Sequence, residues 1–148
     1  MYDRKLSPDA SAQIAGGSDA PQLHGYALFY QKHNHVLIEV HVTGLPTVNP
    51  SGFYGLHIHE GSSCGGTAFA ETGSHYNPAV AQHPEHAGDL PPLLMCNGGA
   101  WMSVRTDRFR VQDIIGRTVV IHSRPDDFHT KPAGNAGAKI ACGVIENR

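Results

Sequence analysis

The sequence predicts an all-β fold, and three observations support this fold class. Short apolar and β-branched segments alternate in polarity with a period of two, which is typical of half-buried strands. The 17 glycines and 10 prolines indicate many turns. No apolar pattern with a helical period persists along the chain. We therefore expect one domain of about eight short antiparallel strands, arranged as a β-sandwich or a barrel.

Length and composition limit the class of protein. The chain has 148 residues, 40% hydrophobic and 16% charged, which suits one domain with a core and excludes a disordered chain. With 11 basic and 13 acidic residues the formal charge is −2, so no basic surface for nucleic acid is expected. No apolar run reaches the length of a membrane span. The N-terminal segment MYDRKLSPDA lacks the apolar region of a signal peptide.

The first elements follow from alternation and turn residues. Residues 1–11 are polar, and we expect them to form a mobile lead-in to the domain. Aromatic and apolar residues alternate in 22–31, which predicts a strand, and Lys32–His35 predicts the turn after it. The segment 36–42 places β-branched side chains on one face, which predicts a half-buried strand. A further alternating strand is expected at 53–59.

Later strands are separated by long loops. Short apolar segments predict strands at 93–95, 101–105, 118–122 and 138–145. Asn97–Gly99 predicts a hairpin turn between the first two of them. Val111–Ile115 fits either a short strand or a helical turn. The loops 60–89 and 123–137 adjoin strands that carry histidines, and loops of this length are usually functional or disordered.

Histidine is unusually frequent, with 11 residues in the chain. In the strand 53–59, Leu56 and Ile58 point to one face, so His57 and His59 stand together on the other. The first long loop adds three histidines and an aspartate, and a later strand ends in another histidine. The candidate metal ligands are therefore His57, His59, His75, His83, His86, Asp89 and His122.

These ligands are too many for one tetrahedral ion. Two four-coordinate sites result if one imidazole is shared through both of its nitrogens. Imidazole suits zinc and copper, and one carboxylate among imidazoles suits zinc. The remaining histidines are expected to be surface residues or satisfied core residues. They are His24, His33, His35, His41 and His129.

Several stretches resemble a known family. GLHIHEGSSC, GSHYNP, HAGDL, VVIHSRPDD and GNAGAKIACGVI are similar, in this order, to motifs of the copper/zinc superoxide dismutases. The resemblance covers most of residues 12–146. It implies an eight-stranded Greek-key β-sandwich or flattened barrel with two long functional loops, in agreement with the fold class expected from alternation. The dismutase-like domain would span residues 12–148.

The resemblance also implies which residue binds which metal. It assigns copper to His57, His59, His75 and His122, and zinc to His75, His83, His86 and Asp89, with His75 as the bridge. Asp126 matches an aspartate that accepts the outer N–H groups of one copper histidine and one zinc histidine, here His57 and His83. The alternative for Asp126 is a carboxylate that only caps loop amides.

The cysteines carry a second implication of the resemblance. Cys64 and Cys142 occupy the disulfide positions of the family, and a disulfide favours an extracytoplasmic or secreted setting. The alternative is a pair of buried thiols in a reducing compartment. Cys96 has no partner and is expected to pack as a small apolar residue at the end of the strand 93–95.

The reaction implied by the resemblance is dismutation, in which two superoxide ions and two protons give dioxygen and hydrogen peroxide. Copper changes oxidation state, zinc does not, and His75 passes a proton to the product. The family guides its anionic substrate with an arginine. Lys139 takes that position here, with the charge but without the planar fork. Ala133 replaces a threonine that narrows the eukaryotic channel, so a more open site is expected.

Two other functions stay open on the residues alone. H-x-H with a third histidine also fits a mononuclear zinc hydrolase, although no general base is evident nearby. A copper carrier or metal store on the same fold would keep the ligands with little turnover, and Lys139 in the arginine position leaves this alternative open. The sequence does not choose between a monomer and a homodimer.

Overall fold

The computed structural model describes residues 7–148. Within these residues, eight strands form one antiparallel sheet in the order β5-β4-β7-β8-β1-β2-β3-β6. A short α-helix, α1, and a 3-10 helix, η1, lie in the connections. The elements are β1 (Ala10–Gly16), β2 (His24–Gln31), β3 (Val36–Thr43), β4 (Phe53–His59), η1 (Thr67–Thr72), β5 (Asp89–Leu94), β6 (Ala100–Thr106), α1 (Val111–Ile114), β7 (Thr118–His122) and β8 (Lys139–Asn147).

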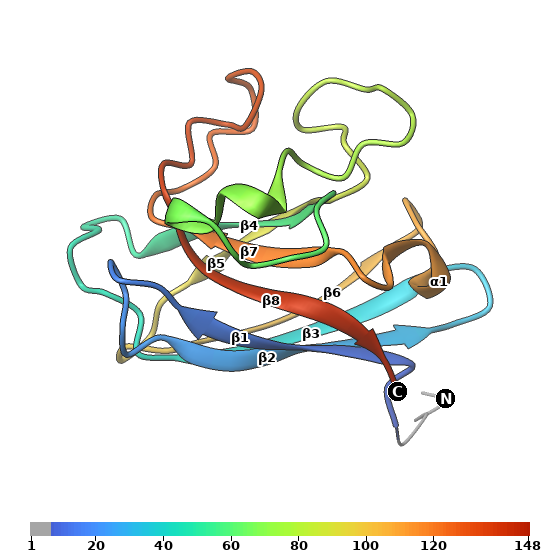
Figure 1. The fold of residues 1–148 in the computed structure, drawn as a ribbon, viewed down its shortest axis with the longest axis horizontal. Coiled ribbons are helices and arrows are strands. Elements are labelled where there is room, and N and C mark those ends of the chain that lie inside the picture. The colour runs from blue at the N-terminus through green and yellow to red at the C-terminus, as the bar shows by residue number, and fades with distance from the viewer. Residues whose placement is uncertain (1–6) are drawn as a thin grey trace.

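The sheet curls until its two edges come close together. In Figure 1, β4 and β7 lie in one layer and β1, β2 and β3 in the other. The edge strands β5 and β6 contact each other, so the sheet forms a nearly closed barrel, and the turn that joins them is closed by an isolated bridge between Cys96 and Gly99. The connections β3–β4 and β6–β7 join strands that are not neighbours in the sheet. The predicted eight-stranded antiparallel β-fold is confirmed.

The core lies between the layers and is built from alternate residues. β3 alternates between buried and more exposed positions, as its polarity pattern predicts. In β4, Leu56 and Ile58 belong to the core. His57 and His59 point away from it, yet they too are buried, with 0% and 2% of their surface exposed. Something other than the sheet must therefore cover them.

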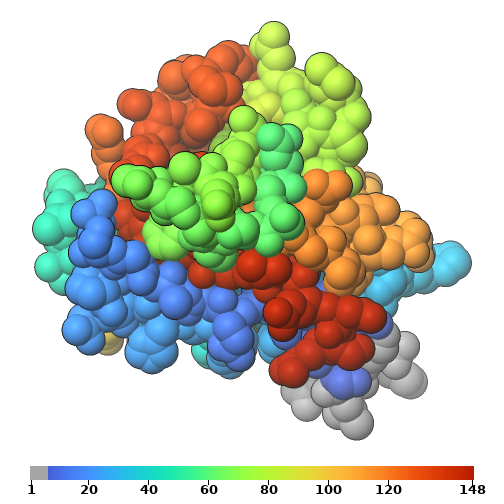
Figure 2. Space-filling view, viewed as in Figure 1, coloured from blue at the N-terminus to red at the C-terminus, as the bar shows by residue number. Residues whose placement is uncertain are grey.

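The cover is formed by the loops of residues 60–88 and 123–138. They rise above the layer that contains β4 and β7 (Figure 1) and make up the upper part of the molecule in Figure 2. A disulfide between Cys64 and Cys142, 78 residues apart, ties the first loop to β8. In the described part of the chain, no helix is long and apolar enough to cross a membrane.

The N-terminal strand and the small helix refine the sequence prediction. β1 was not placed by alternation, because its inward residues include the small Ala10 and Ala12, which give little apolar signal. It begins inside the predicted lead-in, whose residues 1–6 lie outside the described residues. The ambiguous segment at 111–115 begins with the helical turn α1, in which Val111 and Ile114 are buried.

The predicted hairpin turn at Asn97–Gly99 is confirmed, but the expectation that the strands on either side of it pair with each other is wrong. Asn97 and Gly98 both have positive φ, 51° and 80°, and Cys96 and Gly99 exchange two backbone hydrogen bonds. The flanking strands, however, pair elsewhere, β5 with β4 and β6 with β3, because the chain changes layer here. The prediction that Cys96 is packed is also wrong. It is exposed, since it belongs to the turn and not to β5.

Candidate metal centre

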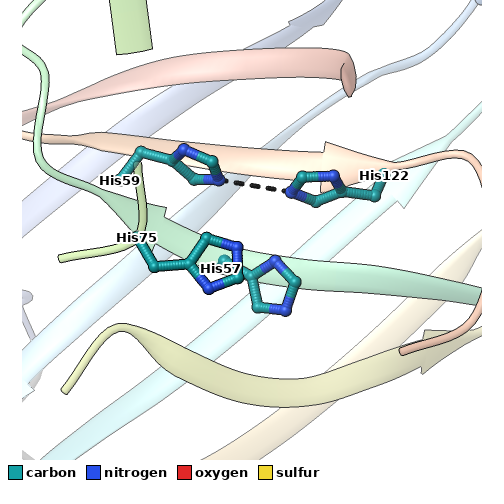
Figure 3. Close-up of side chains that lie close together, drawn as sticks. All are labelled: His57, His59, His75 and His122. Atoms are coloured by element: carbon teal, nitrogen blue, oxygen red, sulfur yellow. Dashed lines mark hydrogen bonds between the residues drawn. The ribbon is translucent and has the colours of Figure 1, made fainter. Parts of the chain in front are cut away.

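The first group of histidines comes from two paired strands and one loop. His57 and His59 lie on β4, which pairs with β7, and His122 is the last residue of β7. His75 belongs to the loop, whose backbone runs against β4 through an isolated bridge with His59. The four side chains converge (Figure 3), and each offers a ring nitrogen within 4.8 Å of the others.

Backbone carbonyls set which nitrogen of two rings faces inward. His59 Nδ1 lies 2.8 Å from the Gly73 carbonyl oxygen, and His122 Nδ1 lies 3.3 Å from that of Gly137. Because carbonyls only accept, these nitrogens carry the protons. The Nε2 lone pairs therefore face each other across 3.2 Å (Figure 3). Burial lowers the pKa of His59 to about 2 and of His122 to about 3, which keeps both rings neutral.

The second group surrounds Asp89, the first residue of β5. One carboxylate oxygen lies 2.8 Å from His75 Nδ1, and the other lies 3.1 Å from His83 Nδ1 and 3.2 Å from His86 Nδ1. His75 Nδ1 and His86 Nδ1 are 3.2 Å apart. The His86 backbone N–H donates to the Asp89 carboxylate over 3.0 Å, which fixes the turn between them. Burial acts to raise the Asp89 pKa, but bonding to His75 and the charges of the histidines hold it below its ordinary value.

Asp126 links the two groups by hydrogen bonds to the outer nitrogens of one histidine in each. Its oxygens lie 2.7 Å from His57 Nε2 and 2.7 Å from His83 Nε2. The backbone N–H of Phe128 donates to it over 2.8 Å. Burial acts to raise the Asp126 pKa, but these hydrogen bonds outweigh it and lower the pKa below its ordinary value. The ionised carboxylate therefore accepts hydrogen bonds from the outer N–H groups of both rings, which leaves their Nδ1 lone pairs facing inward.

Three buried ring nitrogens at this centre make no hydrogen bond and are suited to bind metal ions. Among residues 7–148, His57 Nδ1, His75 Nε2 and His83 Nδ1 have no hydrogen-bond partner. A buried polar atom without a partner is costly, and an ion would remove that cost. A tetrahedral zinc site with bonds of about 2.0 Å places its ligand atoms about 3.3 Å apart, close to the separations around Asp89. His75 is oriented to both sides at once, with Nδ1 toward Asp89 and Nε2 free.

A cavity of about 660 Å³ opens over the histidines. His59, His75 and His122 form part of its lining, and Lys139 stands at its side. Burial lowers the pKa of the Lys139 ammonium. Ala133, from the second loop, also lines the cavity. A small anion from solvent could thus reach the ring nitrogens beside a cation.

The two groups of histidines occur in a chain that matches a known protein family. The family model of copper/zinc superoxide dismutase matches residues 23–145 of the chain. The chain belongs to the copper/zinc superoxide dismutase family. The metals of this family are copper and zinc, which are also the ions that imidazole and carboxylate ligands of this kind prefer.

Individual members of the family are similar over most of the chain. Cu-Zn superoxide dismutase 2 of Aquifex aeolicus is 35% identical, covering 98% of this chain and 92% of the relative. Cu-Zn superoxide dismutase of Deinococcus radiodurans is 32% identical over 74% of this chain and 69% of the relative. Extracellular superoxide dismutase of Rattus norvegicus is 32% identical over 86% of this chain, which spans 56% of that protein.

The predicted metal ligands and Asp126 lie together here, with His86 reaching the group through Asp89 and His75, and Lys139 lines the cavity beside them. The predicted surface histidines stay apart, and none belongs to the two groups of possible metal ligands found among the described residues. The sequence prediction missed the carbonyls of Gly73 and Gly137 and the hydroxyl of Thr72. Backbone carbonyls have no signature in sequence, and Thr72 lies in a loop without alternation, so only the folded chain reveals them.

Proposed function

We propose that this chain disproportionates superoxide at a site where His75 lies between copper and zinc. The single observation that carries this function is the pair of opposed nitrogens on His75. Nδ1 belongs to the group around Asp89, and the buried Nε2 is unpartnered toward the other histidines. One neutral imidazole that loses its remaining proton offers a lone pair to each side.

The ligand sets of the proposal follow the two groups. Copper would be held by His57, His59, His75 and His122 through the ring nitrogens that face inward, and zinc by His75, His83, His86 and Asp89. Asp126 supports both sets, because it fixes His57 and His83 through their outer nitrogens. Copper, when bound, supplies one-electron oxidation and reduction, and zinc supplies fixed positive charge without redox chemistry.

The protein's own groups then bind, orient and protonate the substrate. When it does not bind copper, His75 Nε2 would hold a proton and pass it to the product, since its ring lines the cavity and Nδ1 faces Asp89. Gly73 and Gly137 keep His59 and His122 in one tautomer throughout. The histidine side chains are buried except where the cavity opens, so a proton from solvent would reach the rings from the cavity side.

Lys139 guides the anion in place of the family arginine. It lines the cavity with its ammonium group close to the copper histidines, and a cation there raises the local concentration of an anionic substrate. We expect Lys139→Arg to raise the dismutation rate at low salt and Lys139→Gln to lower it. An unchanged rate in both variants would remove Lys139 from the mechanism.

The function is tested by metal content measured together with the dismutation rate. We expect one copper and one zinc per chain and fast disproportionation of superoxide in pulse radiolysis. One zinc alone with no dismutation would favour the hydrolase. Both metals with negligible turnover would favour a metal store. Loss of the rate in His122→Ala with zinc retained would tie the reaction to the copper side.

We also propose an extracytoplasmic setting for the protein. Cys64 and Cys142 form a disulfide, and disulfides persist in oxidising compartments. Relatives named extracellular superoxide dismutase share 32% identity with the chain. Fractionation of the source cells, with the thiol state of Cys64 and Cys142 measured in each fraction, tests this setting.

A further inference from the structure

Thr72 holds the guiding lysine in place. Lys139 Nζ donates to Thr72 Oγ1 over 2.8 Å and to the Gly73 carbonyl oxygen over 3.0 Å. Thr72 is fully buried, at 0% exposed. Its own hydroxyl donates to the Phe69 carbonyl over 2.8 Å, so the proton of Thr72 is committed and its lone pairs face the ammonium.

The number of N–H donors on the Lys139 ammonium determines what this contact can do. A lysine ammonium has three N–H groups and turns freely on a flexible stem, whereas a guanidinium presents a rigid fork. Two of the three N–H groups are engaged by Thr72 and Gly73. The third remains for an anion in the cavity that Lys139 shares with His59 and His122. Two anchors thus give a lysine the fixed direction that it lacks by itself.

The anchors are also coupled to the metal ligands and to the disulfide. The Gly73 carbonyl that accepts from Lys139 also accepts from His59 Nδ1 over 2.8 Å. Thr72 ends η1, which follows Cys64 in the loop, and Cys142 lies on β8 close after Lys139. The disulfide therefore joins the two segments that carry the two ends of the contact.

We propose that Thr72 is a positioning residue, which fixes the Lys139 ammonium so that its remaining N–H group meets the substrate anion. The inference rests on the proposed dismutation and adds a determinant of anion orientation to it. It explains how a lysine can orient the anion at a position where the family uses the planar guanidinium of an arginine. The observation that carries it is the buried hydroxyl between Phe69 and Lys139.

The test compares Thr72→Val and Thr72→Ser with Thr67→Val as matched control. Thr67 begins the same helix η1 but is exposed. In the copper- and zinc-loaded enzyme, we expect Thr72→Val to lower kcat/KM roughly three- to tenfold at low salt and to flatten its dependence on ionic strength. Thr72→Ser keeps the hydroxyl and should stay within about twofold of the native rate, as should Thr67→Val.

A second readout does not need the metals. In metal-free protein, ¹⁵N relaxation of the Lys139 ammonium group should show restricted motion, lost in Thr72→Val and kept in Thr72→Ser. Unchanged ammonium mobility in Thr72→Val would overturn the proposal. If the native protein shows no dismutation at all, the proposed function fails, while this measurement still decides whether Thr72 fixes Lys139.

A double-mutant cycle separates positioning from a general structural effect. If Thr72 acts through Lys139, then Thr72→Val should change kcat/KM by less than about twofold in a Lys139→Gln background. An equal loss in both backgrounds would overturn the proposal, because Thr72 would then act without the ammonium. Copper and zinc content is measured for each variant, so that a change in occupancy is not mistaken for a change in orientation.

Discussion

Among residues 7–148, histidine rings contact other aromatic or imidazole rings in two regions, and only one of the two holds possible metal ligands. Under the long loops, His57 and His75 lie with ring centroids 3.9 Å apart, both buried. On the outer face of β2, β3 and β6, His41 stacks on Tyr26 at 5.5 Å and meets the edge of Trp101 at 6.0 Å. Tyr26 and Trp101 are 38% and 61% exposed. Closeness of rings therefore does not mark a metal centre by itself.

The difference lies in how each nitrogen is satisfied. In the surface row of Tyr26, His41 and Trp101, solvent reaches the rings and flat faces pack against each other. In the buried cluster, outer nitrogens are held by Asp126 and by carbonyls, and inner nitrogens are left without partners. A group of histidines is ready to bind a metal ion when its rings are buried, held in one orientation and left with ring nitrogens that have no hydrogen-bond partner. The loops that cover the cluster create this condition.

Removing the disulfide should have the largest effect, because it anchors the cover over the buried cluster. The Cys64–Cys142 link closes a loop of 78 residues. The chain-entropy model gives about 4.5 kcal/mol as an upper value for its contribution to the free energy of unfolding. We expect a loss of that order for the double variant Cys64→Ser, Cys142→Ser in urea unfolding. The exposed Cys96→Ser is the control, expected within about 0.5 kcal/mol of native, and an equally small loss in the double variant would contradict the prediction.

Acid should weaken the buried cluster next. In metal-free protein, the pKa values of about 2 for His59 and about 3 for His122 lie below the value of about 6.5 expected in the unfolded chain. Between these values the unfolded state binds more protons, so the free energy of unfolding falls as pH falls. At pH 5 the loss relative to pH 8 should be about 2 kcal/mol for each histidine. Urea unfolding at the two pH values measures it, and equal stability at both would contradict the sign.

Asp126→Asn should then loosen both metals together. The carboxylate accepts from both His57 and His83, whereas an amide offers one ring only a neutral, weaker acceptor and offers the other ring none, so the orientation of both rings is weakened. We expect copper and zinc affinity to fall by about 10- to 100-fold, as measured by competition with chelators. This equals about 1.4–2.7 kcal/mol. The neighbouring Asp127→Asn is the control, and loss of only one metal would show that Asp126 does not link the two groups.

His41→Ala should have the smallest effect, which sharpens the contrast between the regions. It removes two ring contacts from the exposed surface row, each part of a cross-strand pair. We expect a loss of about 0.5–1 kcal/mol in the free energy of unfolding, with metal content and dismutation rate unchanged. A drop in metal content would mean that the surface row and the buried cluster are coupled.

Much of the fold could be predicted because most strands show an alternation of apolar and polar residues in the sequence. β3 and β4 stand where Val, Ile and Leu alternate with other residues, and β7 stands where β-branched residues follow one another; the predicted positions of all three match the structure closely. The sequence does not predict β1, because alanine adds little to the hydrophobic pattern. At Asn97–Gly99 the local turn chemistry was right, but which strands pair across a turn depends on the layer that each enters. Cys96 is exposed because it belongs to this turn and not to a strand.

By itself, the sequence indicated the chemistry of the candidate site: which residues could supply nitrogen and oxygen ligands, and that they exceed the needs of one ion. Only the tertiary structure decided which nitrogen of each ring faces inward, since that depends on acceptors far away in the chain, such as Asp126 for His57 and Gly137 for His122. It also decided that Thr72 meets Lys139, across 67 positions of sequence. Side-chain type is a local property, whereas the direction of a hydrogen bond exists only once the partner has been brought into place.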